Sequence, residues 1–443
     1  MLTSCNSTPD DLDGELSIVN GQETDTWTLS PAPQTIEVDL VGTMRTTVTT
    51  VNAPTSEINL GLGTPAEEIA AFDVTGYDAN NDAVIHGTTV PYSITTFANA
   101  APVVFVGRTG GISRPPGNLL FEYQHPLTEV VGHAYMIVAG GDLASATQNP
   151  IDLYDMGGWD VAPQQTWLAS VPQSWAVAVT AWTLLVVNDD GASSIDLTTG
   201  TASAVTAPAN FDFANVVNGK TFAAPDDTRY IVGATRTTGA ATDSVLRVGA
   251  DGTLSALTLT APRLGATAGF VNGLFVIAGG SDTAAGAEML NAAGTEFVAL
   301  DYPPDANQGA ALAQLDTSTA LLVGGADSSG ASAGLRTLDI TCNASCTTTS
   351  LTKLDFPFTN AQAFWLADDS LVLSGDSADN QTHVFTLTKP DDFALTEVAL
   401  RTPRTKASLA QFPNGQVGAV GGDAVADGSP ATTLEAYFPP FSK

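Results

Sequence analysis

Short apolar runs that end in small or acidic residues recur along the chain from about residue 130 onward. The first run is MIVAGGD at 136–142, and the last is VGAVGGD at 417–423. Aligned on one position, the seven runs fall at 140, 187, 232, 279, 324, 374 and 421, so their spacings are 47, 45, 47, 45, 50 and 47 residues. A period this regular predicts an internal repeat of one supersecondary unit.

Each repeat carries further signals of short strands joined by turns. A proline lies 14 to 24 residues before every aligned position, in the order Pro126, Pro172, Pro208, Pro262, Pro303, Pro357 and Pro403. After each run, a polar loop leads to another apolar strand, and a turn such as Asp251-Gly252 leads to a fourth. Four-stranded meanders cannot bury their own faces, so the pattern predicts an all-β fold with a seven-bladed β-propeller over residues 113–443.

The best-kept repeat also has a recognisable motif. It contains Gly140-Gly141, Tyr154-Asp155, Gly158 and Trp159, and the dipeptide Pro-Arg occurs as Pro262-Arg263 and Pro403-Arg404. These residues resemble the kelch repeat, in which a strand ends in Gly-Gly and is followed by Tyr-Asp, Gly, Trp and then Pro-Arg. Gly-Gly is kept at four of the seven aligned positions, and Tyr-Asp and Trp are lost from the other repeats. The resemblance implies a kelch-like propeller and says less about function.

A ring of blades needs a closure, because an open ring exposes unpaired strand edges. After the last aligned run, one good strand remains at 433–438. The segment LLFEY at 119–123 lies just before Pro126, where the outer strand of a preceding blade belongs. We therefore expect the N-terminal strand at 119–123 to complete the C-terminal blade.

Residues 31–112 show alternation of apolar and polar residues at 35–40, 46–51 and 71–77. Short strands at this spacing predict a small β-sandwich. The stretch 74–87 resembles the hairpin of bacterial Ig-like modules, which implies an Ig-like domain. Residues 107–117 are rich in Gly and Pro and are interpreted as the linker to the propeller.

The N-terminal residues are interpreted as a lipid attachment site and a tether. Cys5 follows Leu2-Thr3-Ser4, which resembles the lipobox of bacterial lipoproteins and implies lipidation of Cys5. The basic and apolar regions of a signal peptide are missing before Leu2. The polar, acidic residues after Cys5 predict a flexible tether within 1–30. The simpler alternative is an ordinary cysteine in a flexible tail.

The net negative charge of the chain limits the classes of partner that it can bind. The chain has 15 Lys and Arg against 47 Asp and Glu, a formal net charge of -32. A phosphate backbone or an anionic membrane surface would repel such a protein, so nucleic acid is excluded as a partner. No apolar run reaches the ~18 residues of a membrane helix, so membrane association is expected only through Cys5.

Cys342 and Cys346 form a C-x3-C pair with no other Cys or clustered His nearby to complete a zinc site. A disulfide is the better interpretation, and it agrees with an exported protein.

The search for catalytic motifs finds none. The chain has only four histidines, at 86, 125, 133 and 383, with no metalloprotease motif, nucleophile elbow or phosphate-binding loop. Kelch-like copper oxidases use a Cys–Tyr crosslink, for which this chain offers no suitable cysteine, and the Asp boxes of sialidase-like propellers are missing as a series. We expect no catalytic residues and no enzyme.

Charged residues follow the aligned runs and could gather at one face of the propeller. They are Asp142, Asp189, Arg236, Asp282, Asp327, Asp376 and Asp423. The simpler interpretation is that Asp serves these turns by hydrogen bonding to its own backbone. The functional alternative is a binding face that attracts a basic partner or a hard cation such as Ca²⁺. No metal or other cofactor is expected from a sequence motif.

The leading hypothesis is a non-enzymatic lipoprotein of the cell envelope, exported to the bacterial outer membrane or cell surface, whose propeller binds or scaffolds a protein or glycan. The first alternative is an extracellular glycan-active enzyme that uses Asp residues of the channel face, because glycoside hydrolysis needs two carboxyl groups with unequal pKa values. The second alternative is a passive surface-layer component.

Overall fold

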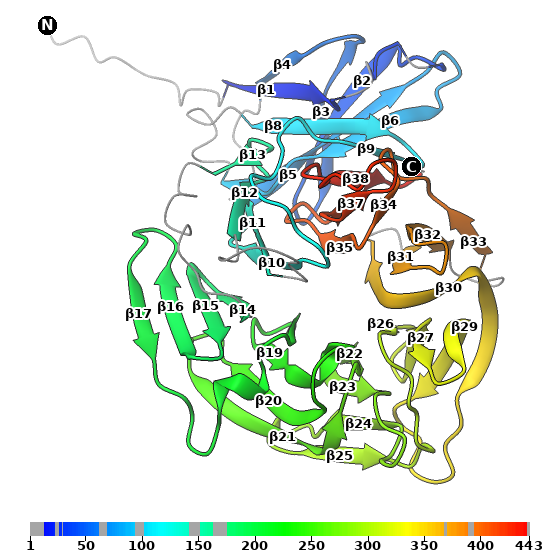
Figure 1. Ribbon diagram of the computed structural model, residues 1–443. Coiled ribbons are helices and arrows are strands. Elements are labelled where there is room, and N and C mark those ends of the chain that lie inside the picture. The colour runs from blue at the N-terminus through cyan, green and yellow to red at the C-terminus, as the bar shows by residue number, and fades with distance from the viewer. Residues whose placement is uncertain are drawn as a thin grey trace, which may run out of the picture.

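The computed structural model describes residues 13–22, 26–28, 30–61, 69–93, 102–140, 151–162, 175–366, 370–388 and 394–440. Strands dominate these residues, and the helices described there are two 3-10 turns, η3 (Phe213–Asn215) and η4 (Gly233–Thr235). Neither has the length or hydrophobicity that crossing a bilayer requires. Figure 1 shows a ring of blades with a smaller strand domain beside it.

The smaller domain contains eight strands. They are β1 (Asp13–Asn20), β2 (Thr35–Val41), β3 (Arg45–Asn52), β4 (Glu57–Gly61), β5 (Ile69–Tyr77), β6 (Ala83–Thr88), β7 (Tyr92–Ser93) and β8 (Val103–Arg108). The strand order is β3-β2-β5-β6-β8-β1-β4, with β7 beside β5. Because residues 103–106 of β8 pair with β1 and residues 107–108 with β6, one strand joins the two halves. Leu16, Phe72 and Val104 lie in their common core. The Ig-like assignment stays a prediction.

The expected tether over residues 1–30 is wrong for part of its length. β1 pairs antiparallel with β4 and parallel with β8. Leu16 and Ile18 alternate with polar neighbours and are buried, which is the pattern of a strand with one face on a core. Residues 1–12 lie outside the described residues.

The prediction of a seven-bladed propeller is confirmed. The first four blades are separate four-stranded meanders. Blade 1 contains β10 (Leu127–Val131), β11 (Tyr135–Ala139), β12 (Ile151–Asp155) and β13 (Asp160–Val161); blade 2 contains β14 (Trp175–Thr180), β15 (Thr183–Asn188), β16 (Gly191–Asp196) and β17 (Ala202–Val205). Blade 3 contains β18 (Lys220–Ala223), β19 (Arg229–Val232), β20 (Thr242–Val248) and β21 (Leu254–Arg263); blade 4 contains β22 (Thr267–Val271), β23 (Leu274–Ala278), β24 (Ala287–Leu290) and β25 (Phe297–Leu300).

Blades 5 and 6 share one long strand, β30 (Thr349–Trp365). Its first half pairs with β29 and its second half with β31, so it is the outer strand of blade 5 and then the inner strand of blade 6. The other strands are β26 (Ala311–Gln314), β27 (Thr319–Val323), β28 (Ala326–Asp327) and β29 (Gly330–Asp339) in blade 5, and β31 (Ser370–Asp376), β32 (Thr382–Thr388) and β33 (Ala394–Glu397) in blade 6.

Blade 7 closes the ring with a strand from the N-terminal side, but a different segment from the expected one. Its strands are β35 (Ser408–Gln411), β36 (Val417–Val420), β38 (Glu435–Phe438) and β9 (Gly111–Ser113), and a small pair, β34 (Arg404–Thr405) and β37 (Asp423–Ala424), lies beside them. β9 pairs antiparallel with β38. The segment 119–123 instead packs in a core, with Leu119 and Tyr123 buried. Residues 111–113, expected to be linker, therefore supply the closing strand.

The Pro-Arg dipeptides act inside the blades. The Arg263 guanidinium donates to the carbonyl of Gly279 at 2.7 Å and pairs with Glu288 on the third strand at 2.5 Å, with both side chains fully buried. Arg404 makes the same contacts in blade 7, with the carbonyl of Gly421 and with Glu435. The arginine thus ties the segment before each inner strand to the turn after the second strand.

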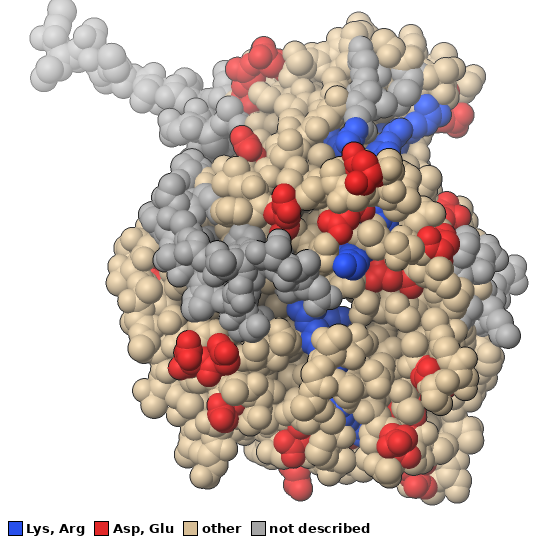
Figure 2. Space-filling model, viewed as in Figure 1, with Lys and Arg blue, Asp and Glu red and all other residues tan. Residues whose placement is uncertain are grey.

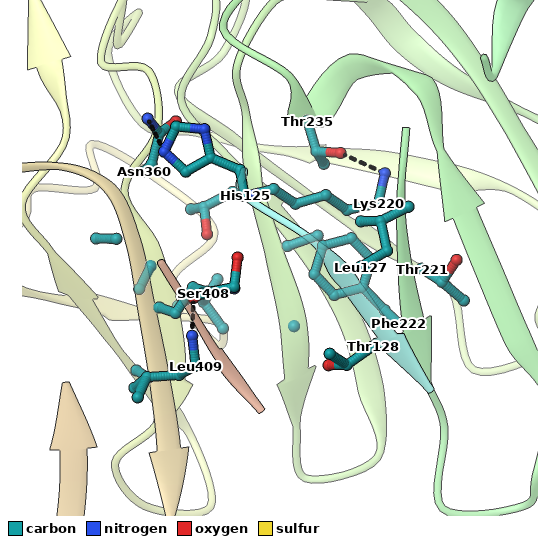
Figure 3. Close-up of a pocket in the computed structure, with 18 of the residues that line it drawn as sticks. His125, Leu127, Thr128, Lys220, Thr221, Phe222, Thr235, Asn360, Ser408 and Leu409 are labelled. Atoms are coloured by element: carbon teal, nitrogen blue, oxygen red, sulfur yellow. Dashed lines mark hydrogen bonds between the residues drawn. The ribbon is translucent and has the colours of Figure 1, made fainter. Parts of the chain in front are cut away.

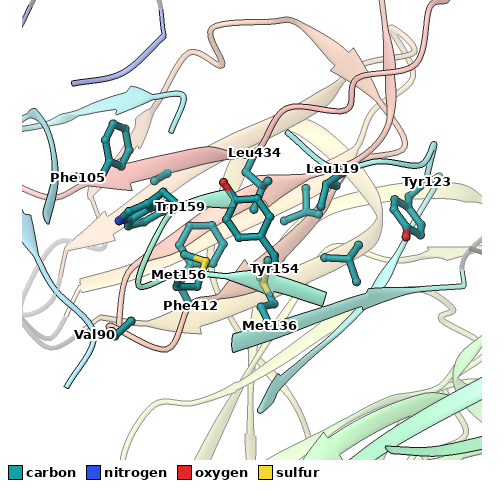
Figure 4. Close-up of a cluster of buried hydrophobic side chains, with 14 of the residues drawn as sticks. Val90, Phe105, Leu119, Tyr123, Met136, Tyr154, Met156, Trp159, Phe412 and Leu434 are labelled. Carbon is teal, nitrogen blue, oxygen red and sulfur yellow. The ribbon is translucent and has the colours of Figure 1, made fainter. Parts of the chain in front are cut away.

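The smaller domain packs against blades 1 and 7. Phe105 of β8 meets Trp159 edge-on at 5.0 Å and Phe438 at 5.2 Å between ring centroids, and Phe412 belongs to the same cluster (Figure 4). Asn414 also donates to the carbonyl of Thr88 at 2.9 Å. The smaller domain is therefore in packed contact with the blades at the ring closure.

Candidate functional site

The inner strands of the propeller surround a cavity of about 400 Å³ (Figure 3). β10, β18, β22, β26, β35 and the second half of β30 contribute residues to it. Its lining combines hydroxyl and amide side chains, such as Thr128 and Gln362, with rings such as Phe222 and Phe270. A concave site of this size and mixed chemistry is typical of sites for small molecules or for one group of a larger ligand.

One end of this cavity is built by a repeated turn. A residue with positive φ lies two positions before the inner-strand segment in six blades, and these residues are His125, Asn218, Gly265, Gly309, Asn360 and Lys406. The corresponding position of blade 2 lies outside the described residues. Neighbouring turns are joined because Ala361 N donates to Gly309 O at 2.8 Å and His125 N donates to Lys406 O at 2.7 Å. We call this end of the cavity the channel mouth.

His125 is fixed at the channel mouth by a network that joins blades 1 and 6. Its Nε2 lies 2.5 Å from Asp376 Oδ2, and Asn360 Nδ2 donates to the same oxygen at 3.1 Å. The Thr382 hydroxyl donates to Asp376 Oδ1 at 2.8 Å. Burial alone would raise the Asp376 pKa, but the hydrogen bond and charge of His125, together with the hydrogen bonds from Thr382 and Asn360, outweigh burial and lower it. Asp376 therefore stays ionised and holds the imidazole in place.

Two cationic residues of blade 3 also line the cavity. Thr235 links them, because its hydroxyl accepts from Lys220 N at 3.0 Å and donates to Val232 O at 2.8 Å, while Arg236 is the next residue. Arg236 Nε donates to Asn218 O at 2.7 Å, and only 9% of the residue is exposed. Figure 2 shows Lys and Arg atoms at the edge of the central opening of the propeller.

Glu129 is the acidic residue of the cavity lining. Burial raises its pKa to about 7, although Arg229, whose Nε lies 3.2 Å from Glu129 Oε2, partly offsets the effect of burial. The group therefore exchanges a proton near neutral pH.

The structure gathers only part of the expected ring of charged residues. Asp376 joins the His125 network, Asp423 accepts from Gln124 Nε2 at 2.6 Å, and Arg236 lines the cavity. Asp189, Asp282 and Asp327 are exposed, and Asp327 caps its own turn by accepting from Ser329 N at 2.7 Å. Asp142 lies outside the described residues.

Among the described residues, no group of three or more His, Cys, Asp and Glu side chains is placed to hold a metal ion. The predicted disulfide between Cys342 and Cys346 is confirmed, with an S–S distance of 2.10 Å. Cys5 lies outside the described residues.

Sequence reasoning missed the cavity residues Lys220, Glu129 and Asn360, and it assigned no role to His125. The signal that could have found the channel mouth is the small residue one position after each left-handed turn, as in GAT at 265–267, GAA at 309–311, NAQ at 360–362 and KAS at 406–408. That short pattern repeats in register with the longer apolar runs.

Comparisons with known proteins support no inference about the fold or the function of this chain. No family model matches the chain, and no curated protein matches it. Among solved structures, one described as the structure of YjhT is similar to this chain with 14% sequence identity and a TM-score of 0.40. The match covers 59% of this chain and 93% of that chain. A TM-score and a sequence identity this low support no inference about this chain, so the propeller assignment rests on the strand pairings.

Proposed function

We propose that this protein is a non-enzymatic binding protein of the cell envelope whose propeller holds a partner at the channel mouth. A glycan fits the site better than a protein does, and a protein partner would have to insert a side chain. The proposal includes export and attachment to the bacterial outer membrane or cell surface through a lipid on Cys5. The disulfide between Cys342 and Cys346 supports an oxidising location.

The observation that carries the proposal is the cavity itself. Its hydroxyl, amide and guanidinium groups converge from separate blades, and rings such as Phe222 lie among them. Sugars are recognised by this combination, because their hydroxyl groups need hydrogen-bond partners while their apolar faces pack on aromatic rings.

A binding role is favoured over catalysis because two titratable side chains of the lining are already paired with other charged residues. His125 contacts Asp376, and Glu129 contacts Arg229. A general acid or base must instead reach the substrate within hydrogen-bond distance.

The test is a glycan array probed with the wild-type protein and with Thr128→Trp. Thr128 lies on β10 and lines the cavity, so the larger indole fills the space that a ligand would take. Ser203→Trp is the matched control, because Ser203 is exposed on the outer strand β17. We expect binding by the wild type and the control and its loss in Thr128→Trp. Equal binding by all three proteins would place the glycan site elsewhere, and no binding by any would contradict a glycan partner.

A glycan-active enzyme is the second candidate, and one observation favours it. Burial holds the pKa of Glu129 near 7, the range of a general acid in glycoside hydrolysis, and Asp376 remains ionised. Incubation of a bound glycan with the protein tests this role. Hydrolysis that disappears in Glu129→Gln while binding is kept would replace the binding hypothesis with catalysis.

A further inference from the structure

The charge of the cavity lining is opposite to that of the chain. The whole sequence has 47 Asp and Glu against 15 Lys and Arg. Among the described residues that line the cavity, Lys220 and Arg236 are cationic and Glu129 alone is acidic, and Glu129 is already held by Arg229. His125 also lines the cavity, but its Nε2 already pairs with Asp376. A strongly acidic protein has thus placed basic groups around its central cavity.

These basic groups are held by the fold. Gly233 begins the turn that carries Arg236, and a Cβ there would lie 2.1 Å from Asn215 O, so only glycine permits this close approach. Thr235 then fixes the start of β18 at Lys220 through its hydroxyl. Lys220 at the start of β18 and Arg236 just after η4 therefore reach one cavity from the same blade.

We infer that the channel mouth binds an anionic group of the ligand through Lys220 and Arg236. This inference rests on the proposed function and narrows its ligand to an anionic saccharide or a similarly small polar anion. The guanidinium and ammonium groups donate charge-assisted hydrogen bonds to an oxyanion, and hydroxyl side chains such as Thr128 and Ser408 can serve the neutral part of the ligand. The negative field of the remaining protein repels anions, so binding of an anion here depends on these local cationic groups.

Isothermal titration calorimetry with a matched pair of sugars tests the inference. Glucuronate and glucose differ at one carbon, so a preference for glucuronate reports on the carboxylate. We expect glucuronate to bind more tightly than glucose, and Lys220→Met and Arg236→Gln each to weaken glucuronate binding by about tenfold, as expected for loss of one charge-assisted hydrogen bond. Arg247→Gln is the control, because it removes the same charge from blade 3 at a residue outside the cavity lining.

Inorganic phosphate is the third probe, and it distinguishes the kind of anion. Phosphate binding without glucuronate binding, weakened by the same two substitutions and not by Arg247→Gln, would support the site and assign it to a phosphate group. Equal affinity for glucuronate and glucose, or equal effects of all three substitutions, would overturn the inference. Neutral glycans that bind the array and are lost in Thr128→Trp would in that case leave the proposed function standing.

Discussion

Two buried carboxyl groups of blade 1 keep their protons to higher pH than exposed carboxyl groups do. Burial raises the pKa of Asp152 to about 6, although the backbone N–H groups of Phe121 and Leu120 and the hydroxyl of Tyr123 partly offset it. Burial likewise raises the pKa of Glu129 to about 7. Because the folded state binds these protons more tightly than the unfolded chain, both groups favour folding at low pH and lose that contribution as pH rises through their folded pKa values.

The free energy of unfolding should therefore fall between about pH 4.5 and pH 7 as Glu129 ionises. Glu129→Gln removes the titration, so its unfolding free energy should decline less over this range, by up to about 3 kcal/mol. Urea unfolding at a series of pH values measures both proteins. Parallel pH profiles for the two proteins would show that Glu129 titrates no differently in the folded and unfolded states.

At the scale of an element, the same place in neighbouring blades holds ion pairs of different burial. Glu288 on β24 and Arg336 on β29 occupy equivalent third-strand positions, opposite Ile277 and Leu322. Glu288 pairs with Arg263, and both side chains are fully buried. Arg336 pairs with Asp305 at 3.1 Å, and about a quarter of each side chain is exposed. Of these two pairs, only the Glu288–Arg263 pair leaves a charge in the interior when one partner is removed.

Arg263→Gln should lower the free energy of unfolding by about 3–5 kcal/mol, because Glu288 then remains buried without its cation. Arg336→Gln is the matched control and should cost about 1 kcal/mol or less, since water reaches that pair. Chemical denaturation of both variants gives the two values. Similar losses in the two blades would contradict the assignment of blade 4 stability to its buried pair.

The same elements show what the sequence could and could not predict. The blades were predictable because apolar second strands and Gly-Gly turns recur at a regular spacing. The closing strand β9 was not, because Gly111–Ser113 has only three residues and lies in a Gly- and Pro-rich segment. The apolar residues at 119–123 gave the pattern of a strand because they fill a core. The cavity could not be predicted from the sequence for another reason, because His125 and Asp376 meet in space although 251 residues separate them.

At the scale of the whole molecule, closure of the propeller ring depends on the smaller domain. β8 ends at Arg108 and β9 begins at Gly111, so the strand that closes the propeller follows directly from a strand of the smaller domain. A Cβ at Gly107 would lie 2.3 Å from the ring of Phe438, the last residue of β38. The two domains therefore pack without space for a methyl group.

Gly107→Ala should lower the free energy of unfolding by about 1–3 kcal/mol, because Phe438 must move within a packed core. Gly111→Ala is the control, since a Cβ there has its nearest contact at 3.4 Å, to Arg108 O. Thermal unfolding followed by calorimetry measures both variants. Equal stability of Gly107→Ala and wild type would mean that the contact between the domains does not support the closure.

The central claim is that binding occurs at the channel mouth and not at the exposed acidic turns. One titration tests it most directly: the affinity of a glycan selected on the array is measured for Thr128→Trp and for a triple variant with Asp189, Asp282 and Asp327 changed to Asn. Asn keeps the turn hydrogen bonds, so the triple variant should fold normally. We predict that Thr128→Trp loses binding and that the triple variant binds within about twofold of wild type, because distant exposed charges contribute little at physiological salt. Binding kept by Thr128→Trp and lost by the triple variant would contradict the account.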